Sequence, residues 1–167
     1  MDKEFSFEEE KLKRYKNAIN KGAELRKFYD RDEDKNLNCI LEEIFIDYNI
    51  EVIYDEKYNH KCKFDNGIWK IFLPYKTSQY RDNVAIATFL GKIVLNHELN
   101  EEKELQESPK DSIPYIEQHK FAEKFLMPDS YFLKKYKEFN GNEDYLSNYF
   151  SVPRTTILIK KILLDLE

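Results

Sequence analysis

The segment at residues 84–95, VAIATFLGKIVL, constrains the fold more than any other part of the sequence. Its residues are apolar on nearly every side of a helical wheel, and Asp82 just before them is a favourable N-cap. A helix that is apolar all round has to be enclosed by other elements. We therefore predict a buried central helix, with the rest of the domain packed around it.

A small β-sheet is predicted before this helix. Residues 50–54 alternate between apolar and polar side chains, as a strand does. Two further β-type runs, 61–64 and 68–73, flank Asp65-Asn66-Gly67. Asn-Gly between two such runs is typical of a tight hairpin, because the turn requires residues that tolerate positive φ. We expect a small antiparallel sheet beside the central helix, preceded by an amphipathic helix at 37–48.

Helices are predicted through most of the C-terminal half. Pro114 opens one that runs to about Met127, and Pro128 ends it. Shorter apolar periodic runs predict three more helices, at 131–139, 145–149 and 154–166. The expected fold class is thus α+β.

The N-terminal residues form a separate feature of the sequence. Residues 7–29 favour a long amphipathic helix with an apolar stripe, and a charged linker follows it. The stripe is expected to contain Leu12, Tyr15, Ile19 and Leu25. We divide the chain into an N-terminal helix and linker at 1–35, a main domain at 36–139 and a C-terminal helical pair at 140–167 that packs on the same core.

Composition limits the classes of partner. The chain has 167 residues, enough for one domain with a sizeable core, and a net charge of -5. An acidic protein has no strong electrostatic attraction for nucleic acid, so a protein partner is favoured. Membrane association is not expected, because no apolar run approaches the roughly 20 residues of a transmembrane helix.

The two cysteines, Cys39 and Cys62, form no CxxC motif and no disulfide framework. A cytoplasmic location, where thiols stay reduced, is the simplest setting for them. Both are expected to be buried as small apolar groups.

A window in the predicted helix after Pro114 carries a family resemblance. It reads EQHKFAEKFLMP, and together with the order of elements it resembles the ImmA/IrrE family of zinc peptidases. The second motif of that family reads roughly E-A-N-x-F-A-x-x-L-L-M-P. Six residues match it: Glu117, Phe121, Ala122, Leu126, Met127 and Pro128. The resemblance extends from about residue 37 onward and implies a zincin-like fold.

The first motif of the family, H-E-L-G-H, is degenerate in this chain. Aligning Leu90-Gly91 with its Leu-Gly places Thr88 and Lys92 at the two zinc-binding histidines and Phe89 at the catalytic glutamate. A zinc peptidase needs metal ligands and a carboxylate that accepts a proton from water. These three residues provide neither, so we expect no catalytic residue and no cofactor. Lys92 is expected to pair with Glu117 in place of the metal.

A second way of aligning the zinc-binding motif leaves open whether the protein is an enzyme. In NHELNE, His97 and Glu101 are spaced as two ligands on one helical face, with Glu98 as the base. Glu117 or His119 would be the third ligand of this displaced zinc site. Zinc prefers imidazole or thiolate to an added carboxylate, so we favour structural roles for the histidines, with His60 in a loop.

The resemblance leads to one preferred function and two alternatives. We prefer a pseudoenzyme that regulates or inhibits a protein partner, such as a helix-turn-helix repressor or a host defence protein, and that comes from a phage or mobile element. The first alternative is an active zinc metallopeptidase that cleaves a regulatory protein. The second is a DNA-binding regulator that uses the C-terminal helices, whose nearby basic residues are Arg154, Lys160 and Lys161. The sequence indicates no oligomeric state.

Overall fold

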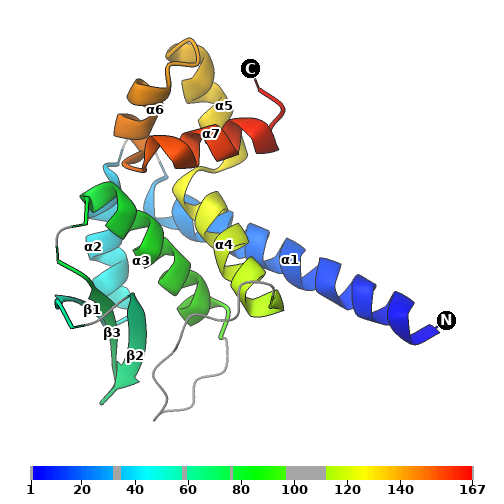
Figure 1. Ribbon diagram of the computed structural model, residues 1–167, viewed down its shortest axis with the longest axis vertical. Helices are drawn as coiled ribbons and strands as arrows, with labels where there is room; N and C mark the ends of the chain where they lie inside the picture. The colour runs from blue at the N-terminus through cyan, green and yellow to red at the C-terminus, as the bar shows by residue number, and fades with distance from the viewer. Residues whose placement is uncertain (1, 32–34, 58–59, 76, 97–111, 167) are drawn as a thin grey trace.

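The computed structural model of the protein describes residues 2–31, 35–57, 60–75, 77–96 and 112–166. The sheet lies at one end and the C-terminal helices lie at the other, while the N-terminal half of the first helix projects from the body (Figure 1). In chain order the elements are α1 (Asp2–Tyr29), α2 (Leu37–Asp47), β1 (Ile50–Tyr54), β2 (Lys61–Asp65), β3 (Ile68–Leu73), α3 (Gln79–Val94), α4 (Ile113–Leu126), α5 (Asp129–Glu138), α6 (Glu143–Phe150) and α7 (Arg154–Leu163). The α+β prediction is confirmed.

The three-stranded sheet has the order β1-β3-β2. β2 and β3 form the predicted antiparallel hairpin, and its turn residues Asn66 and Gly67 have φ values of 49° and 79°. β1, however, pairs parallel with β3, with Ile50 opposite Trp69. The prediction of a wholly antiparallel sheet is therefore wrong. β1 occupies the outer edge of β3 instead of pairing with the strand that follows it in the chain.

Helix α3 is the buried central helix that the sequence predicts. It begins earlier than expected, because the side chain of Ser78 accepts a hydrogen bond from the backbone N–H of Arg81 and is the N-cap. Asp82 therefore lies inside the first turn, where its carboxylate accepts hydrogen bonds from Thr77 and Tyr54. The apolar residues of α3 that are buried in the core are Ile86, Ala87, Phe89, Leu90 and Ile93.

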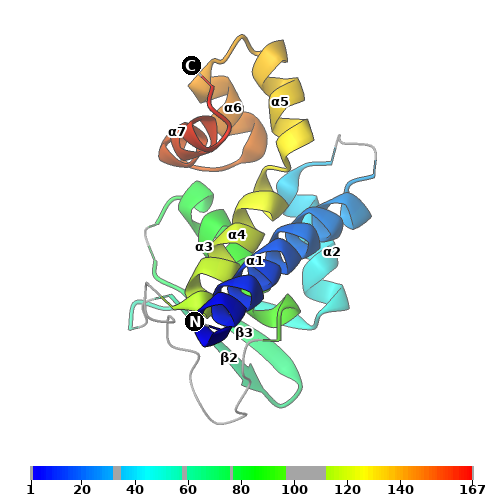
Figure 2. The ribbon, with the colours of Figure 1, turned by 90° about the vertical axis from the view of Figure 1, so that its right-hand side faces the viewer.

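Helix α4 packs against both α3 and α1, and Figure 2 shows α1 and α4 crossing side by side. Glycines allow both close approaches. A Cβ atom on Gly91 would lie 3.1 Å from the Cα of Gln118, and one on Gly22 would overlap the carbonyl oxygen of Phe121. The backbones can approach this closely because neither glycine carries a side chain.

The buried face of α1 coincides only in part with the predicted stripe. Leu12 is 56% exposed, whereas Ala18, Gly22 and Arg26 are buried. Tyr15, Ile19 and Leu25 are partly buried, and Leu25 packs against the core. Only Leu12 of the predicted stripe is exposed, and small residues and a paired arginine complete the buried face. Ala18 belongs to the same hydrophobic cluster as residues of α3, α6 and α7. The division of the chain into units at residues 35 and 139 stays a prediction.

Arg26 fixes the end of α1 to the end of α4. Its guanidinium donates hydrogen bonds to the carbonyl oxygens of Phe125 and Leu126, at 3.3 and 3.0 Å, and its Nε donates to Asp30 at 3.2 Å. The last carbonyl groups of a helix have no partner within the helix. A cation from α1 thus satisfies the C-terminal end of α4.

Lys160 of α7 is fully buried and holds the C-terminal helices to α4 and α5. Its ammonium group contacts the carboxylates of Glu123 and Asp129, and Lys124 donates to Asp129 at 2.5 Å. Burial alone would raise the pKa of Asp129, but the hydrogen bonds from Lys124 and Lys160 lower it below its ordinary value. The carboxylate therefore stays charged.

The two cysteines differ in exposure. Cys62 of β2 is fully buried, as predicted, but Cys39 of α2 is exposed, so the prediction for Cys39 is wrong. Cys39 lies on the solvent side of α2, next to Ile40, which faces the core. In the part of the chain that the structure describes, every helix is too short or too polar to cross a lipid bilayer.

Candidate functional site

A cavity of about 440 Å³ lies between α3 and α4, and we call it the α3–α4 cleft. Its lining residues on α3 follow a helical period of three and four positions, so they share one face of that helix. The described residues that line it are His60, Thr77, Arg81, Val84, Ala85, Thr88, Phe89, Lys92, Tyr115, Gln118 and His119. Thr88 and Lys92, the first and last residues of the degenerate motif, thus line the same cleft.

The three residues aligned with the catalytic motif all line this cleft. The hydroxyl of Thr88 donates a hydrogen bond to the carbonyl oxygen of Val84, one turn earlier, at 2.9 Å. Phe89 is 4% exposed, Lys92 is 2% exposed, and the Lys92 Nζ lies 5.9 Å from the centre of the Phe89 ring. None of these three side chains is an imidazole, a thiolate or a carboxylate, the groups that usually hold zinc or take a proton from zinc-bound water.

Glu117 of α4 is bound by a residue that sequence analysis missed. Arg14 of α1 donates from Nε and Nη2 to the two carboxylate oxygens of Glu117, at 2.9 and 2.8 Å. The hydrogen bond to Glu117 is the main cause of the raised pKa of Arg14. The expected pairing of Lys92 with Glu117 stays a prediction. No local pattern could have revealed Arg14, which lies 103 positions away along the chain.

Two histidines face the cleft. The Nε2 atom of His60 is buried and has no hydrogen-bond partner among the described residues. The ring of His119 packs against Tyr115, with ring centres 4.2 Å apart. Sequence analysis placed His60 in a loop and gave it no role. The sequence near the start of a strand does not show which helix residues will lie beside it in the fold.

The described residues of the cleft do not fit a zinc ion. Zinc sites need at least three protein ligands, of which His, Cys, Asp and Glu are the usual ones. Among the residues that the structure describes, no group of three or more such side chains is placed to hold a metal. His97, Glu98 and Glu101 lie outside the described residues, so the displaced site with Glu117 or His119 stays a prediction.

Two basic residues belong to the lining of the cleft. Arg81 and Lys92 line it, and none of its described lining residues is acidic. The charge of Lys92 also acts on Cys62: burial, the larger effect, raises the pKa of this thiol to about 12, while Lys92 partly lowers it. The described lining of the cleft thus contains two basic residues and no acidic one, in a protein whose net charge is -5.

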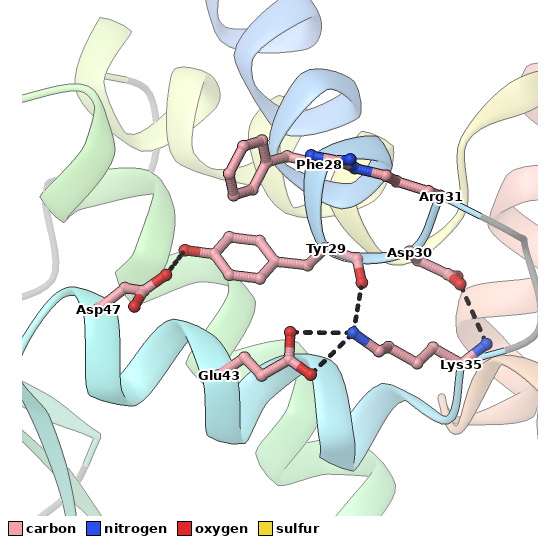
Figure 3. Close-up of a pocket in the computed structure, with 7 residues that line it drawn as sticks. All are labelled: Phe28, Tyr29, Asp30, Arg31, Lys35, Glu43 and Asp47. Atoms are coloured by element: carbon pink, nitrogen blue, oxygen red, sulfur yellow. Dashed lines mark hydrogen bonds and ion pairs between the residues drawn. The ribbon is translucent and has the colours of Figure 1, made fainter.

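A second cavity, of about 500 Å³, lies between the end of α1 and α2 (Figure 3). Its polar side chains bond to one another. The hydroxyl of Tyr29 donates to Asp47 at 2.6 Å, and Lys35 bonds to Glu43 and to the carbonyl oxygen of Tyr29. These contacts join α1 to α2 and engage most of the polar groups there. The α3–α4 cleft is the stronger candidate for a binding site.

Fold and site together define a zincin-like α+β domain whose described cleft lacks a zinc-binding set. The family model of the IrrE N-terminal-like domain matches residues 47–160, which is more than half of the chain. The protein therefore belongs to the IrrE N-terminal-like family, and the resemblance seen in the sequence is confirmed.

A solved structure shows the same fold. It is a Mycobacterium tuberculosis transcriptional regulator, 16% identical in sequence, with a TM-score of 0.55. The match covers 86% of this chain and 50% of the regulator, so this chain spans half of that protein's length. At this identity the likeness concerns the fold alone. A search among curated proteins found no match.

Proposed function

We propose that this protein is a catalytically inactive member of its family that binds a segment of another protein in the α3–α4 cleft. The observation that carries the proposal is the position of Thr88, Phe89 and Lys92, which line the cleft on α3. They are the residues that the resemblance aligns with the two zinc-binding histidines and the catalytic glutamate.

Peptide hydrolysis at such a site requires a metal-bound water and a carboxylate that removes its proton. Thr88 and Lys92 cannot hold zinc at neutral pH, and Phe89 cannot accept a proton. The walls of the cleft nonetheless suit a peptide. Val84 and Phe89 offer apolar contacts, and the cavity has a volume within the usual range of about 300–1,000 Å³ for ligand sites.

Binding without cleavage would make the protein a regulator or inhibitor. By resemblance, its partner is a helix-turn-helix repressor, or a defence protein of the host of a phage or mobile element. The competing zinc peptidase would need His97 and Glu101, with Glu117 or His119 as the third ligand, to hold zinc and Glu98 to act as the base.

DNA binding through the C-terminal helices has less support. Arg154 and Lys161 both bond to Glu143, at 2.8 and 3.1 Å, and Lys160 is fully buried. Phosphate contacts need cations that can reach the duplex. These three side chains are engaged within the protein.

A peptide-display selection tests the proposal. Random peptides are selected on the wild type and on Thr88→Trp, because an indole ring in place of the small threonine side chain would fill the cleft. Ile46→Trp is the matched control, because Ile46 is 80% exposed on α2 and does not line the cleft. We expect peptides that bind the wild type and Ile46→Trp but not Thr88→Trp, and that stay intact with the zinc-loaded protein.

Two outcomes would overturn the proposed function. One is the absence of any peptide that distinguishes the wild type from a folded Thr88→Trp variant. The other is cleavage of the enriched peptides by the zinc-loaded wild type, which would support the peptidase alternative.

A further inference from the structure

Helix α7 turns a row of apolar side chains toward solvent, and we call this row the α7 stripe. It consists of Leu158, Ile159, Ile162 and Leu163, which are 40%, 58%, 76% and 63% exposed. Their spacing of three and four positions places them on one side of the helix. In Figure 2, α7 is seen nearly end-on at the outer edge of the C-terminal helices. The α7 stripe is therefore accessible to another molecule.

The α7 stripe is not the face that holds α7 to the domain. The other side of the helix does so through Ile157, which lies in the hydrophobic core, and through the buried Lys160. Single exposed apolar side chains are common on protein surfaces, whereas a contiguous group of them marks a surface that meets another molecule. The described lining of the α3–α4 cleft includes none of these four residues, so the α7 stripe is a separate surface.

The α7 stripe contains no charged residue. The charged residues of α7 are Arg154, Lys160 and Lys161, and each of them bonds to a carboxylate of its own chain. The surface thus offers apolar contact and no ionic recognition. Its occupant has to present an apolar face of similar shape.

A second copy of the chain presents such a face, because the α7 stripe is symmetric. Ile159 and Ile162 lie equally far from its middle, and Leu158 and Leu163 are its two ends. If two α7 helices pack antiparallel about a two-fold axis, Ile159 of one copy lies opposite Ile162 of the other. Leu158 lies opposite Leu163 in the same way. A two-fold interface requires this self-complementarity, and the opposed helix dipoles also favour it.

We propose that the α7 stripe is a dimer interface, in which two copies of this chain pair their α7 helices antiparallel about a two-fold axis. A standard interface buries roughly 800 Å² on each partner. Four partly exposed aliphatic side chains supply only part of that area, so the dimer belongs to the smaller and weaker class. We expect it to dissociate reversibly, with a Kd on the order of 10 µM.

Sedimentation equilibrium of the full chain tests the dimer. From about 1 to about 500 µM, on both sides of the expected Kd, the wild type should pass from one chain to two. Ile159→Glu should raise the Kd at least about a hundredfold, because the two-fold axis places its carboxylate in the apolar interface twice. Ile46→Glu is the control, since Ile46 is 80% exposed on α2 and the change of charge is the same. It should dimerise as the wild type does.

Mixing two variants tests the antiparallel pairing. Labelled Ile159→Glu protein is sedimented with an excess of unlabelled Ile162→Lys protein. In the proposed dimer the introduced carboxylate lies opposite the introduced ammonium group, and the second Ile159–Ile162 contact stays apolar. The mixed dimer should therefore form at least about tenfold more tightly than the Ile159→Glu dimer. Ile162→Glu in place of Ile162→Lys is the control and should give no recovery. Both positions are exposed, so the circular dichroism spectra should match the wild type.

The inference is overturned if the wild type remains a single chain at about 500 µM, which would leave the α7 stripe to a different partner. Equal dimerisation of Ile159→Glu and Ile46→Glu would also overturn it, because the contact would then lie elsewhere. So would equal association of the labelled protein with Ile162→Lys and Ile162→Glu, because the helices would then not pair in this register. Peptide binding in the α3–α4 cleft is a separate property and is unaffected by these outcomes.

Discussion

Arg14 of α1 and Glu117 of α4 form a two-pronged ion pair, with Nε–Oε1 and Nη2–Oε2 distances of 2.9 and 2.8 Å. Paired hydrogen bonds of this kind are among the stronger polar contacts in proteins. The side chain of Glu117 is 5% exposed, so its charge depends on partners within the protein. The carboxylate that matches the first position of the family's second motif is thus engaged by an arginine.

Replacing Arg14 should destabilise the fold, because it removes both hydrogen bonds from a buried carboxylate. We expect Arg14→Met to lower the free energy of unfolding by about 1–2 kcal/mol, a modest value because Arg14 itself is 40% exposed. Urea denaturation measures the change. Lys13→Met, at an exposed neighbouring position, should have an effect within about 0.5 kcal/mol, and equal losses in the two variants would contradict this account.

Gly22→Ala tests the close approach of α1 to α4. In an exposed helix this change stabilises by up to about 1 kcal/mol, because alanine favours helix. Here the added methyl group would overlap the carbonyl oxygen of Phe121, so we expect a lower thermal unfolding midpoint. Asn20→Ala, exposed on the same helix, should be neutral or stabilising. A rise in the midpoint for Gly22→Ala would show that the helices are farther apart.

Lys160→Met tests the buried cation that holds α7. The change leaves two carboxylates, Glu123 and Asp129, with less compensating charge, and we expect a loss of about 3 kcal/mol in the free energy of unfolding. Lys161→Met is the control, because its partner Glu143 keeps the ion pair with Arg154 and the loss should be much smaller. A similar loss in both variants would be evidence against the central role of Lys160.

The two thiols should differ in reactivity. Burial raises the pKa of Cys62 to about 12, so almost none of it is thiolate near pH 8, whereas Cys39 is exposed. We expect iodoacetamide at pH 8 to modify Cys39 in the folded protein and Cys62 only after unfolding. Mass spectrometry of digested protein identifies the modified residue. Rapid modification of Cys62 in the native state would mean that β2 opens readily.

Local patterns predicted the local parts of the fold. The hairpin follows from Asn66-Gly67, whose positive φ values the turn requires, and the buried helix α3 follows from its continuous apolar surface. The side chains of Thr88 and Lys92 share a helical face, so their common position in the cleft also follows from periodicity.

Long-range relationships could not be predicted in this way. The parallel pairing of β1 with β3 depends on which strand edge is open, and nothing in residues 50–54 specifies it. The buried face of α1 depends on Gly22, which has no side chain and therefore lets α1 approach the backbone of α4 closely. Arg14, which bonds to Glu117, lies on a helix that sequence analysis assigned to a separate unit. The place of His60 in the cleft depends on how the sheet meets α3.

The central claim, that the α3–α4 cleft binds without hydrolysing, is tested most directly by the zinc content of the purified protein. The protein is prepared without chelator and reloaded with zinc, and zinc per chain is measured for the wild type and His97→Ala. This account predicts little zinc and no difference between them. Nearly one zinc per chain in the wild type, lost in His97→Ala, would contradict it and identify NHELNE as a displaced metal site.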